Sequence, residues 1–230
     1  MAKITLGMLA GSISGAIGST VFSHNRGGAY IRNRTIPVKS TTPYSDESKA
    51  DFTAASQAWS ALTEAQREAW RQWAAGNPIT DVLGASRQLA GNAAFTMLAA
   101  RLLRIGSSMP TTPPTEGAPP SLTTLVFDGD IGAGDFDLTY TGTPLAANHR
   151  LYLYGCTVPT QSKRYVENLY RQFNVSDAEQ ASPYDIQTAF TTRFGAPVVG
   201  QYCHCKAFVV DDATGLISAP QRASVVVSTT

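Results

Sequence analysis

Long hydrophobic runs are missing from this chain of 230 residues. No run reaches the length of about eighteen apolar residues that a helix needs to cross a bilayer, so the sequence predicts no membrane-spanning segment. Residues 1–11 have an apolar part, but polar residues and glycines interrupt it, and we expect no export through a signal peptide. Cysteine is also scarce. Three cysteines, an odd number, predict no disulfide framework and indicate folding in a reducing compartment.

The motifs of common enzyme and cofactor-binding classes are missing as well. The sequence contains no nucleophile elbow, no Gly-Lys-Thr phosphate loop, no His-Glu-x-x-His helix and no dinucleotide-binding fingerprint. The glycine-rich segment 11–18 has neither the lysine of a phosphate loop nor the apolar strand that precedes one. The sequence therefore predicts a protein that is not an enzyme and that binds no cofactor.

Cys203, His204 and Cys205 form a cluster with the residue types of a metal site. On a strand the two sulfurs lie on one face and His204 lies on the other, so the three side chains cannot bind one ion. Cys156, on another expected strand, adds at most a third thiol. We therefore expect buried structural cysteines and no metal site.

Residues 128–137 form an acidic, glycine-rich turn. Carboxylate oxygens are ligands that Ca²⁺ takes, but the spacing differs from that of an EF-hand and the bidentate glutamate is missing. We interpret the turn as a solvated acidic loop, and a surface that meets the basic segment of a neighbouring chain is an equal alternative. Its acidic residues are Asp128, Asp130, Asp135 and Asp137.

Acidic residues are absent from residues 1–43, which contain five basic side chains. Residues 107–230 have the opposite excess, with eleven acidic and seven basic side chains. This gradient favours head-to-tail contacts between copies, or an anionic partner for the N-terminus. Residues 1–43 are also rich in glycine and poor in large apolar side chains, so they cannot bury enough surface to fold alone. We interpret them as an assembly arm that gains its order from other molecules.

Within the arm, two segments have the composition of β-strands. Residues 19–23 and 29–34 are β-branched and aromatic, and the turn residues between them predict a hairpin. Alternation places Tyr30 and Arg32 on one face of the second strand, together with Arg34. An isolated hairpin is marginal in water, so this one needs a host sheet or a neighbouring chain. The predicted assembly interface consists of Arg26, Tyr30, Arg32, Arg34 and Lys39.

Residues 44–106 show helical spacing. Apolar residues recur along a first helix, Thr63 and Gln66 have the spacing of a capping box that begins a second, and a third is expected from about residue 86 to 105. These helices carry all three tryptophans of the chain, which predicts a small three-helix bundle. Residues 107–121 contain five prolines and are expected to form a semi-rigid linker.

After the linker the pattern alternates, as in an antiparallel sandwich. A short helix capped by residues 182–185 is expected to run through residue 194 and to end at residue 195. The predicted fold is α+β and multi-domain, with an arm (1–43), a helical bundle (44–106), a linker (107–121) and a β-sandwich of fibronectin-III or immunoglobulin type (122–230). The expected strands are 122–127, 136–140, 151–156, 165–170, 202–210 and 223–227.

Several of these motifs together resemble a class of uncharacterised phage and prophage proteins. They are the glycine-rich segment 11–18, the Gly-x-x-Tyr-x-Arg strand that ends at Arg32, the helix pair Trp59–Trp70 and the Gly-Asn-Ala-x-Phe segment at Gly91–Phe95. The resemblance implies a structural role in a virion and brings no enzymatic activity with it.

The leading hypothesis is a non-enzymatic structural protein of a phage virion or related assembly, as a decoration, neck or tail component. It would be made in the host bacterial cytoplasm and joined by its arm to copies of itself and to other virion proteins. One alternative is a packaging protein whose arginines neutralise phosphates while Tyr30 stacks on bases, although a pI of about 7.7 is low for this class. Another alternative is a bacterial surface or carbohydrate-binding protein that uses the sandwich.

Overall fold

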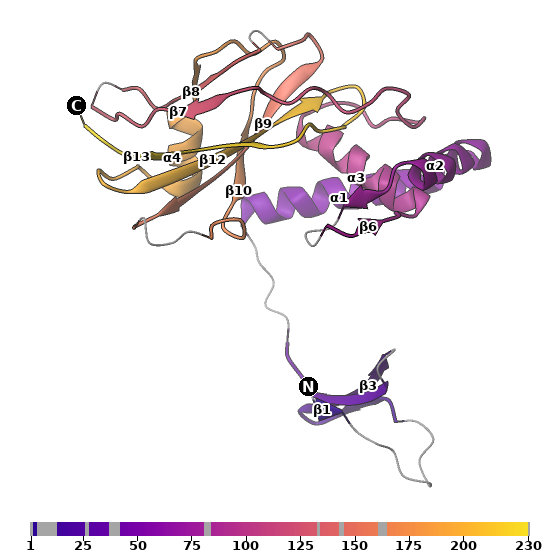
Figure 1. The fold of residues 1–230 in the computed structure, drawn as a ribbon. Coiled ribbons are helices and arrows are strands. Elements are labelled where there is room, and N and C mark those ends of the chain that lie inside the picture. Colours follow the sequence, from indigo (N-terminus) through magenta and orange to yellow (C-terminus); the bar gives the residue numbers. More distant parts are fainter. Residues whose placement is uncertain are drawn as a thin grey trace. The chain divides into compact units, whose positions relative to one another are not determined.

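The structure, a computed structural model, is mixed α+β, which confirms the predicted class (Figure 1). The part that it describes holds four helices and four antiparallel sheets. The chain divides into two compact units, Met1–Ser45 and Asp46–Thr230. The described residues are 2–3, 13–25, 28–36, 42–80, 84–132, 134–142, 145–160 and 165–229.

The first unit is built around a four-stranded sheet. Its central hairpin, β3 (Thr20–Asn25) and β4 (Gly28–Asn33), is paired from Thr20 opposite Asn33 to Asn25 opposite Gly28. The hairpin that the sequence predicted is therefore confirmed. Two short strands that were not predicted, β1 (Ala2–Lys3) and β2 (Gly15–Ile17), extend it in the order β1-β4-β3-β2.

Three helices, α1 (Pro43–Ala61), α2 (Glu64–Gly76) and α3 (Gly91–Arg104), contribute to one apolar core. Trp70 is fully buried there, with its ring 5.3 Å from that of Phe95 in an edge-to-face arrangement. The members of this core are Ala55, Leu62, Trp70, Ala74, Ala94, Phe95, Leu98 and Ala99.

The start of α2 confirms the predicted capping box. The backbone N–H of Gln66 donates to Thr63 Oγ1 at 3.3 Å, and the N–H of Thr63 donates to Gln66 Oε1 at 2.8 Å. The predicted start of α3 near residue 86 is wrong, because β6 (Ser86–Arg87) pairs with β5 (Ile79–Thr80) before the helix begins. Glycine is needed at the actual start, since a Cβ on Gly91 would lie 2.9 Å from the backbone nitrogen of Arg71.

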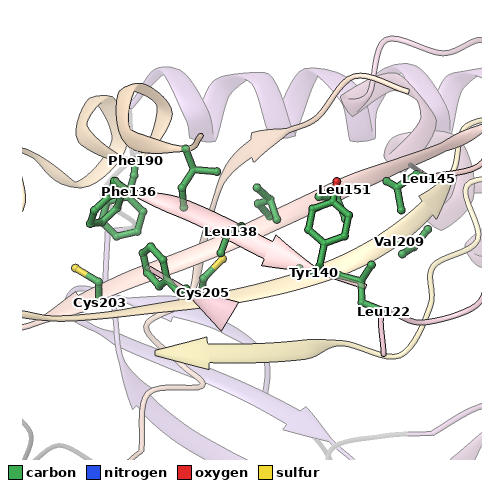
Figure 2. Packing of buried hydrophobic residues seen from close by; sticks show 14 of the residues in the cluster. Leu122, Phe136, Leu138, Tyr140, Leu145, Leu151, Phe190, Cys203, Cys205 and Val209 are labelled. Atoms are coloured by element: carbon green, nitrogen blue, oxygen red, sulfur yellow. The ribbon is translucent and has the colours of Figure 1, made fainter. Parts of the chain in front are cut away.

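Two further sheets and the helix α4 (Gln187–Phe194) surround the largest core (Figure 2). Side chains from both sheets enter it, including Leu138 from one and Leu151 from the other. One sheet has the order β10-β9-β12-β13, and the other has the order β11-β8-β7. The strands are β7 (Leu125–Phe127), β8 (Asp137–Tyr140), β9 (His149–Val158), β10 (Arg171–Val175), β11 (Tyr184–Asp185), β12 (Tyr202–Asp211) and β13 (Gln221–Val226).

One sequence prediction in this region is wrong. Residues 165–170 form no strand but a turn, and the neighbouring strand begins only at Arg171. Contacts with β12 hold this turn. Glu167 binds Lys206 of that strand, and the Tyr170 ring lies 5.1 Å from the Lys206 nitrogen. The short helix that residues 182–185 were expected to cap runs from Gln187 to Phe194, and the backbone N–H of Gln187 donates to Asp185 Oδ1 at 2.7 Å.

Helix α3 is docked against the turn that follows β12. Leu102 and Ile105 share a small core with Val210 at the end of that strand. Arg101 Nη1 donates to the carbonyl oxygen of Gly215 at 3.3 Å. Gly215 has a φ of +73°, and a Cβ there would lie 2.7 Å from the carbonyl oxygen of Leu98, so the helix and the turn meet at a point that only glycine fits.

Residues 107–121, the expected linker, form neither helix nor strand. Met109 packs against the helical core, and Trp70 Nε1 donates to the carbonyl oxygen of Thr111 at 3.3 Å. This segment is therefore in contact with the helices that precede it.

Candidate assembly interface

The predicted interface residues fall in or near one strand of the first unit. Tyr30 and Arg32 belong to β4, and Arg34 follows its end, with its backbone N–H donating to the carbonyl oxygen of Ser19 at 2.7 Å. Arg26 and Lys39 lie outside the described residues.

The register of the sheet separates two chemically different faces. Phe22 of β3 is opposite both Gly15 of β2 and Ile31 of β4, and directly opposed residues share a face. We call this the apolar face. Its residues are Gly15, Ile17, Thr20, Phe22, His24, Ala29, Ile31 and Asn33.

The opposite side is the basic face. Here Val21 lies opposite Arg32, and Ser23 lies opposite Tyr30, so the two predicted interface residues of β4 share a face as the alternation predicted. The described residues of this face are Ala16, Val21, Ser23, Gly28, Tyr30 and Arg32. A phenol and a guanidinium two positions apart provide hydrogen-bond donors and a stacking surface on it.

Both faces are accessible in the described part of the first unit. No side chain described between residues 13 and 36 is buried, and Ile17 on the apolar face is 73% exposed. A sheet normally buries one face against a second layer, and the described strands of this unit form a single layer.

The edges of the sheet are only partly paired. Within the described strands, β2 is opposite Thr20–Phe22 of β3, and β1 is opposite Tyr30 and Ile31 of β4. The remainder of each central strand has one ladder partner. Such edges are positions at which a strand from another chain can add by main-chain hydrogen bonds.

The second unit contains a cluster of like charges in its acidic turn. Asp137 of β8 is directly opposite Asp185 of β11. Burial raises the pKa of Asp137, and repulsion from Asp185, Asp135 and Asp128 raises it further. In the described part of the chain, no group of three or more His, Cys, Asp or Glu side chains is placed to hold a metal ion. The cluster is a negative surface on which a cation from another molecule would relieve repulsion.

The cysteines confirm the expectation of buried, structural thiols. Cys203 and Cys205 point into the large core (Figure 2), and Cys156 is opposite His204 in the ladder. All three are free. Burial raises the pKa of Cys203 to about 12 and also raises that of Cys205, which makes both thiols poor nucleophiles.

A polar and aromatic cluster on the outer face of β9, β12 and β13 was not anticipated. Lys206 is opposite Tyr154 on one side and Arg222 on the other. Glu167 binds both cations, with Arg222 Nη2 at 3.3 Å from its Oε2. The signal in the sequence was the alternation of tyrosines, lysine and phenylalanine along two strands, but Glu167 comes from a distant turn that alternation does not reveal.

A surface hollow lies at the N-terminus of α3. It is lined by Trp59, Arg71 and residues 89–92. Arg71 is the one cationic residue in this lining, and it is already paired with carboxylates. Its Nη1 lies 2.7 Å from Glu64 Oε1 and 2.9 Å from Glu68 Oε2. The hollow therefore has no group available for acid–base or nucleophilic chemistry on a substrate.

In the region that the structure describes, no helix has both the length and the apolar character needed to span a bilayer. No protein-family model, no curated protein and no solved structure matches the chain. The role of the two-faced sheet is therefore inferred from its own chemistry.

Proposed function

We propose that this chain is a non-enzymatic structural subunit that joins a larger assembly through its Met1–Ser45 unit. One observation carries the proposal. The described strands of that unit form a single-layer sheet in which no described side chain is buried. A sheet gains most of its stability by burying one face against another layer, and neighbouring subunits are the source of that layer here.

The setting that we propose is a phage virion or a related assembly, in which the chain is a decoration, neck or tail component made in the host bacterial cytoplasm. The resemblance of the glycine-rich opening and of the strand that ends at Arg32 supports this setting. Within it, the Asp46–Thr230 unit is a small three-helix bundle joined to a β-sandwich of fibronectin-III or immunoglobulin type. Two shared cores, one among the helices and one between two sheets, support that description.

The test is removal of residues 2–36. The Asp46–Thr230 unit has cores of its own, so the shortened chain is expected to stay folded, with a cooperative thermal transition. Sedimentation velocity over a wide range of concentrations should show self-association of the full chain and a monomer after the deletion. Association that survives the deletion unchanged would contradict the proposal.

Nucleic acid is a second candidate partner, because Tyr30 and Arg32 share the basic face and Arg34 is close in sequence. If phosphates bind there, the logarithm of affinity for duplex DNA should fall with log salt by about 0.9 per phosphate contact. Replacing Arg32 and Arg34 by alanine should reduce that slope by about 0.9 for each of the two lost phosphate contacts. An affinity that does not change with salt would exclude this candidate.

A further inference from the structure

Residues 165–170, which we call the strap, cross the outer face of the β10-β9-β12-β13 sheet without joining it. The last residue of the strap directly precedes β10, at one edge of the sheet. Further back in the strap, Glu167 binds Lys206 of β12 and Arg222 of β13, towards the opposite edge. We propose that the strap is a cover that opens on its own, ahead of the rest of the fold, and that it shields the thiol of Cys156 while it is closed.

Cys156 lies on the face that the strap crosses. In the ladder between β9 and β12, Cys156 is opposite His204 and Tyr154 is opposite Lys206, so these four side chains share the outer face. The other two cysteines lie on the inner face, in the large core. Cys156 is nevertheless only 3% exposed, so the outer face is covered at this position.

The strap is in the right place to supply that cover. Arg171 is opposite Gly155, and the same antiparallel register places Tyr170 beside Cys156. Burial raises the pKa of Tyr170 to about 12, and the neighbouring Cys156 contributes to the rise. The Tyr170 ring also lies 5.1 Å from Lys206 Nζ. The strap therefore leaves β10 at the position of the thiol and continues over the sheet towards β13.

The strap is held by surface contacts rather than by burial. None of its residues is buried, whereas the strands beneath it contribute side chains to the large core. The Glu167 side chain is 39% exposed, and ion pairs in contact with water are weak. Within the strap, the Leu169 N–H donates to the carbonyl oxygen of Val166 at 2.9 Å, which is a local turn. Segments of this kind open at a lower free energy than the core that they cover.

Opening would change the surface of the second unit and leave its cores intact. When Glu167 moves away, Lys206 and Arg222 lose its carboxylate, and the outer face becomes more positive. The thiol that is uncovered then has cations on the same face, and such surroundings favour the reactive thiolate. The closed and open strap thus present two chemically different surfaces.

The test removes the carboxylate that closes the strap and measures the reactivity of the thiol beneath it. Glu167→Ala loses both ion pairs, and Glu116→Ala is the matched control, since it removes an exposed carboxylate from the proline-rich segment. Iodoacetamide labelling of each cysteine is followed in buffer by mass spectrometry. We expect Cys156 to react at least about tenfold faster in Glu167→Ala than in the control. Cys203 and Cys205 should stay unreactive in both, because only unfolding of the large core exposes them.

Two outcomes would overturn the inference. If Cys156 reacts no faster in Glu167→Ala than in Glu116→Ala, the strap is not what covers it. If Cys203 and Cys205 react as fast as Cys156, the whole unit has loosened and the strap does not open on its own. Should Glu167→Ala fail to fold, the unaltered chain allows the same comparison in urea below its unfolding transition. Cys156 should then react before the other two cysteines, and simultaneous reaction of all three would contradict the inference.

Discussion

Arg101 of α3 donates a hydrogen bond to the carbonyl oxygen of Gly215, 114 positions further along the chain. This bond and the small core around Leu102 join the helical part of the second unit to its sheets. Burial lowers the pKa of Arg101, because it disfavours the charged form of the guanidinium. The hydrogen bond to Gly215 offsets part of the cost of burying this cation.

Gly215→Ala should destabilise the second unit. The φ of +73° disfavours a side chain, and the added Cβ would lie 2.7 Å from the carbonyl oxygen of Leu98. We expect a loss of about 2–4 kcal/mol in the free energy of unfolding, measured by urea titration. Gly200→Ala is the matched control, because Gly200 has a φ of +84° with open space around its Cβ position and should lose only about 1–2 kcal/mol. Equal losses at the two sites would contradict close docking of α3 on the turn.

The ion pair between Glu167 and Lys206 should make stability depend on acid pH. The hydrogen bond from Lys206, and then its charge and that of Arg222, hold the pKa of Glu167 below its usual value of 4.5. The folded protein therefore binds this proton less readily than the unfolded chain. The stabilisation is present at neutral pH and is lost as the pH falls below about 4.5 through the lowered pKa.

Glu167→Gln should remove that part of the acid dependence. Melting temperatures measured from about pH 7 to about pH 3 should fall less steeply in the variant than in the unaltered chain, with the largest difference between them at neutral pH. Glu116→Gln serves as the control, since Glu116 is an exposed carboxylate in the proline-rich segment. Parallel pH profiles for Glu167→Gln and the unaltered chain would show that the turn at residues 165–170 is not held by this contact.

At Asp137, we expect the stability of the fold to change with pH in the opposite direction. Its pKa is raised by burial and by three neighbouring aspartates, so the folded state binds this proton more readily than the unfolded chain and loses stability as the pH rises through the raised pKa. Asp137→Asn should therefore raise the melting temperature at neutral pH and have little effect at low pH. Asp177→Asn, at an exposed site, should change neither. A neutral-pH melting temperature lowered by Asp137→Asn would mean that the carboxylate makes a favourable contact.

The cysteine thiols should not react with alkylating reagents in the folded protein. All three are buried, and the raised pKa of Cys203 leaves almost no thiolate at neutral pH. Mass spectrometry after iodoacetamide treatment should find no modification in buffer and three modifications in strong denaturant. Rapid labelling of Cys203 or Cys205 in buffer would contradict their position in the core.

The sequence correctly predicted elements that depend on residues close to one another in the chain. The capping box at Thr63 and Gln66, the hairpin of β3 and β4 and the end of α4 at Gly195 all depend on residues close in sequence. The two faces of β4 followed from alternation alone. The hairpin and the two faces of β4 are also features from which the candidate interface was predicted.

Elements determined by distant contacts were missed. Strands β1 and β2 are too short to give a periodic signal and exist through pairing with the central hairpin. Residues 165–170 have strand composition, yet contacts of Glu167 and Tyr170 with Lys206 hold them as a turn. The docking of α3 near Gly215 likewise depends on a residue more than a hundred positions away.

The central claim is that the N-terminal sheet gains its stability from other molecules, and amide hydrogen exchange tests it most directly. Exchange in Thr20–Asn25 and Gly28–Asn33 is measured at increasing protein concentration, with β9 and β12 as internal references. The account predicts that protection of β3 and β4 rises with concentration while that of the references stays constant. Protection of β3 and β4 that is already complete in a dilute monomer and does not change with concentration would contradict it.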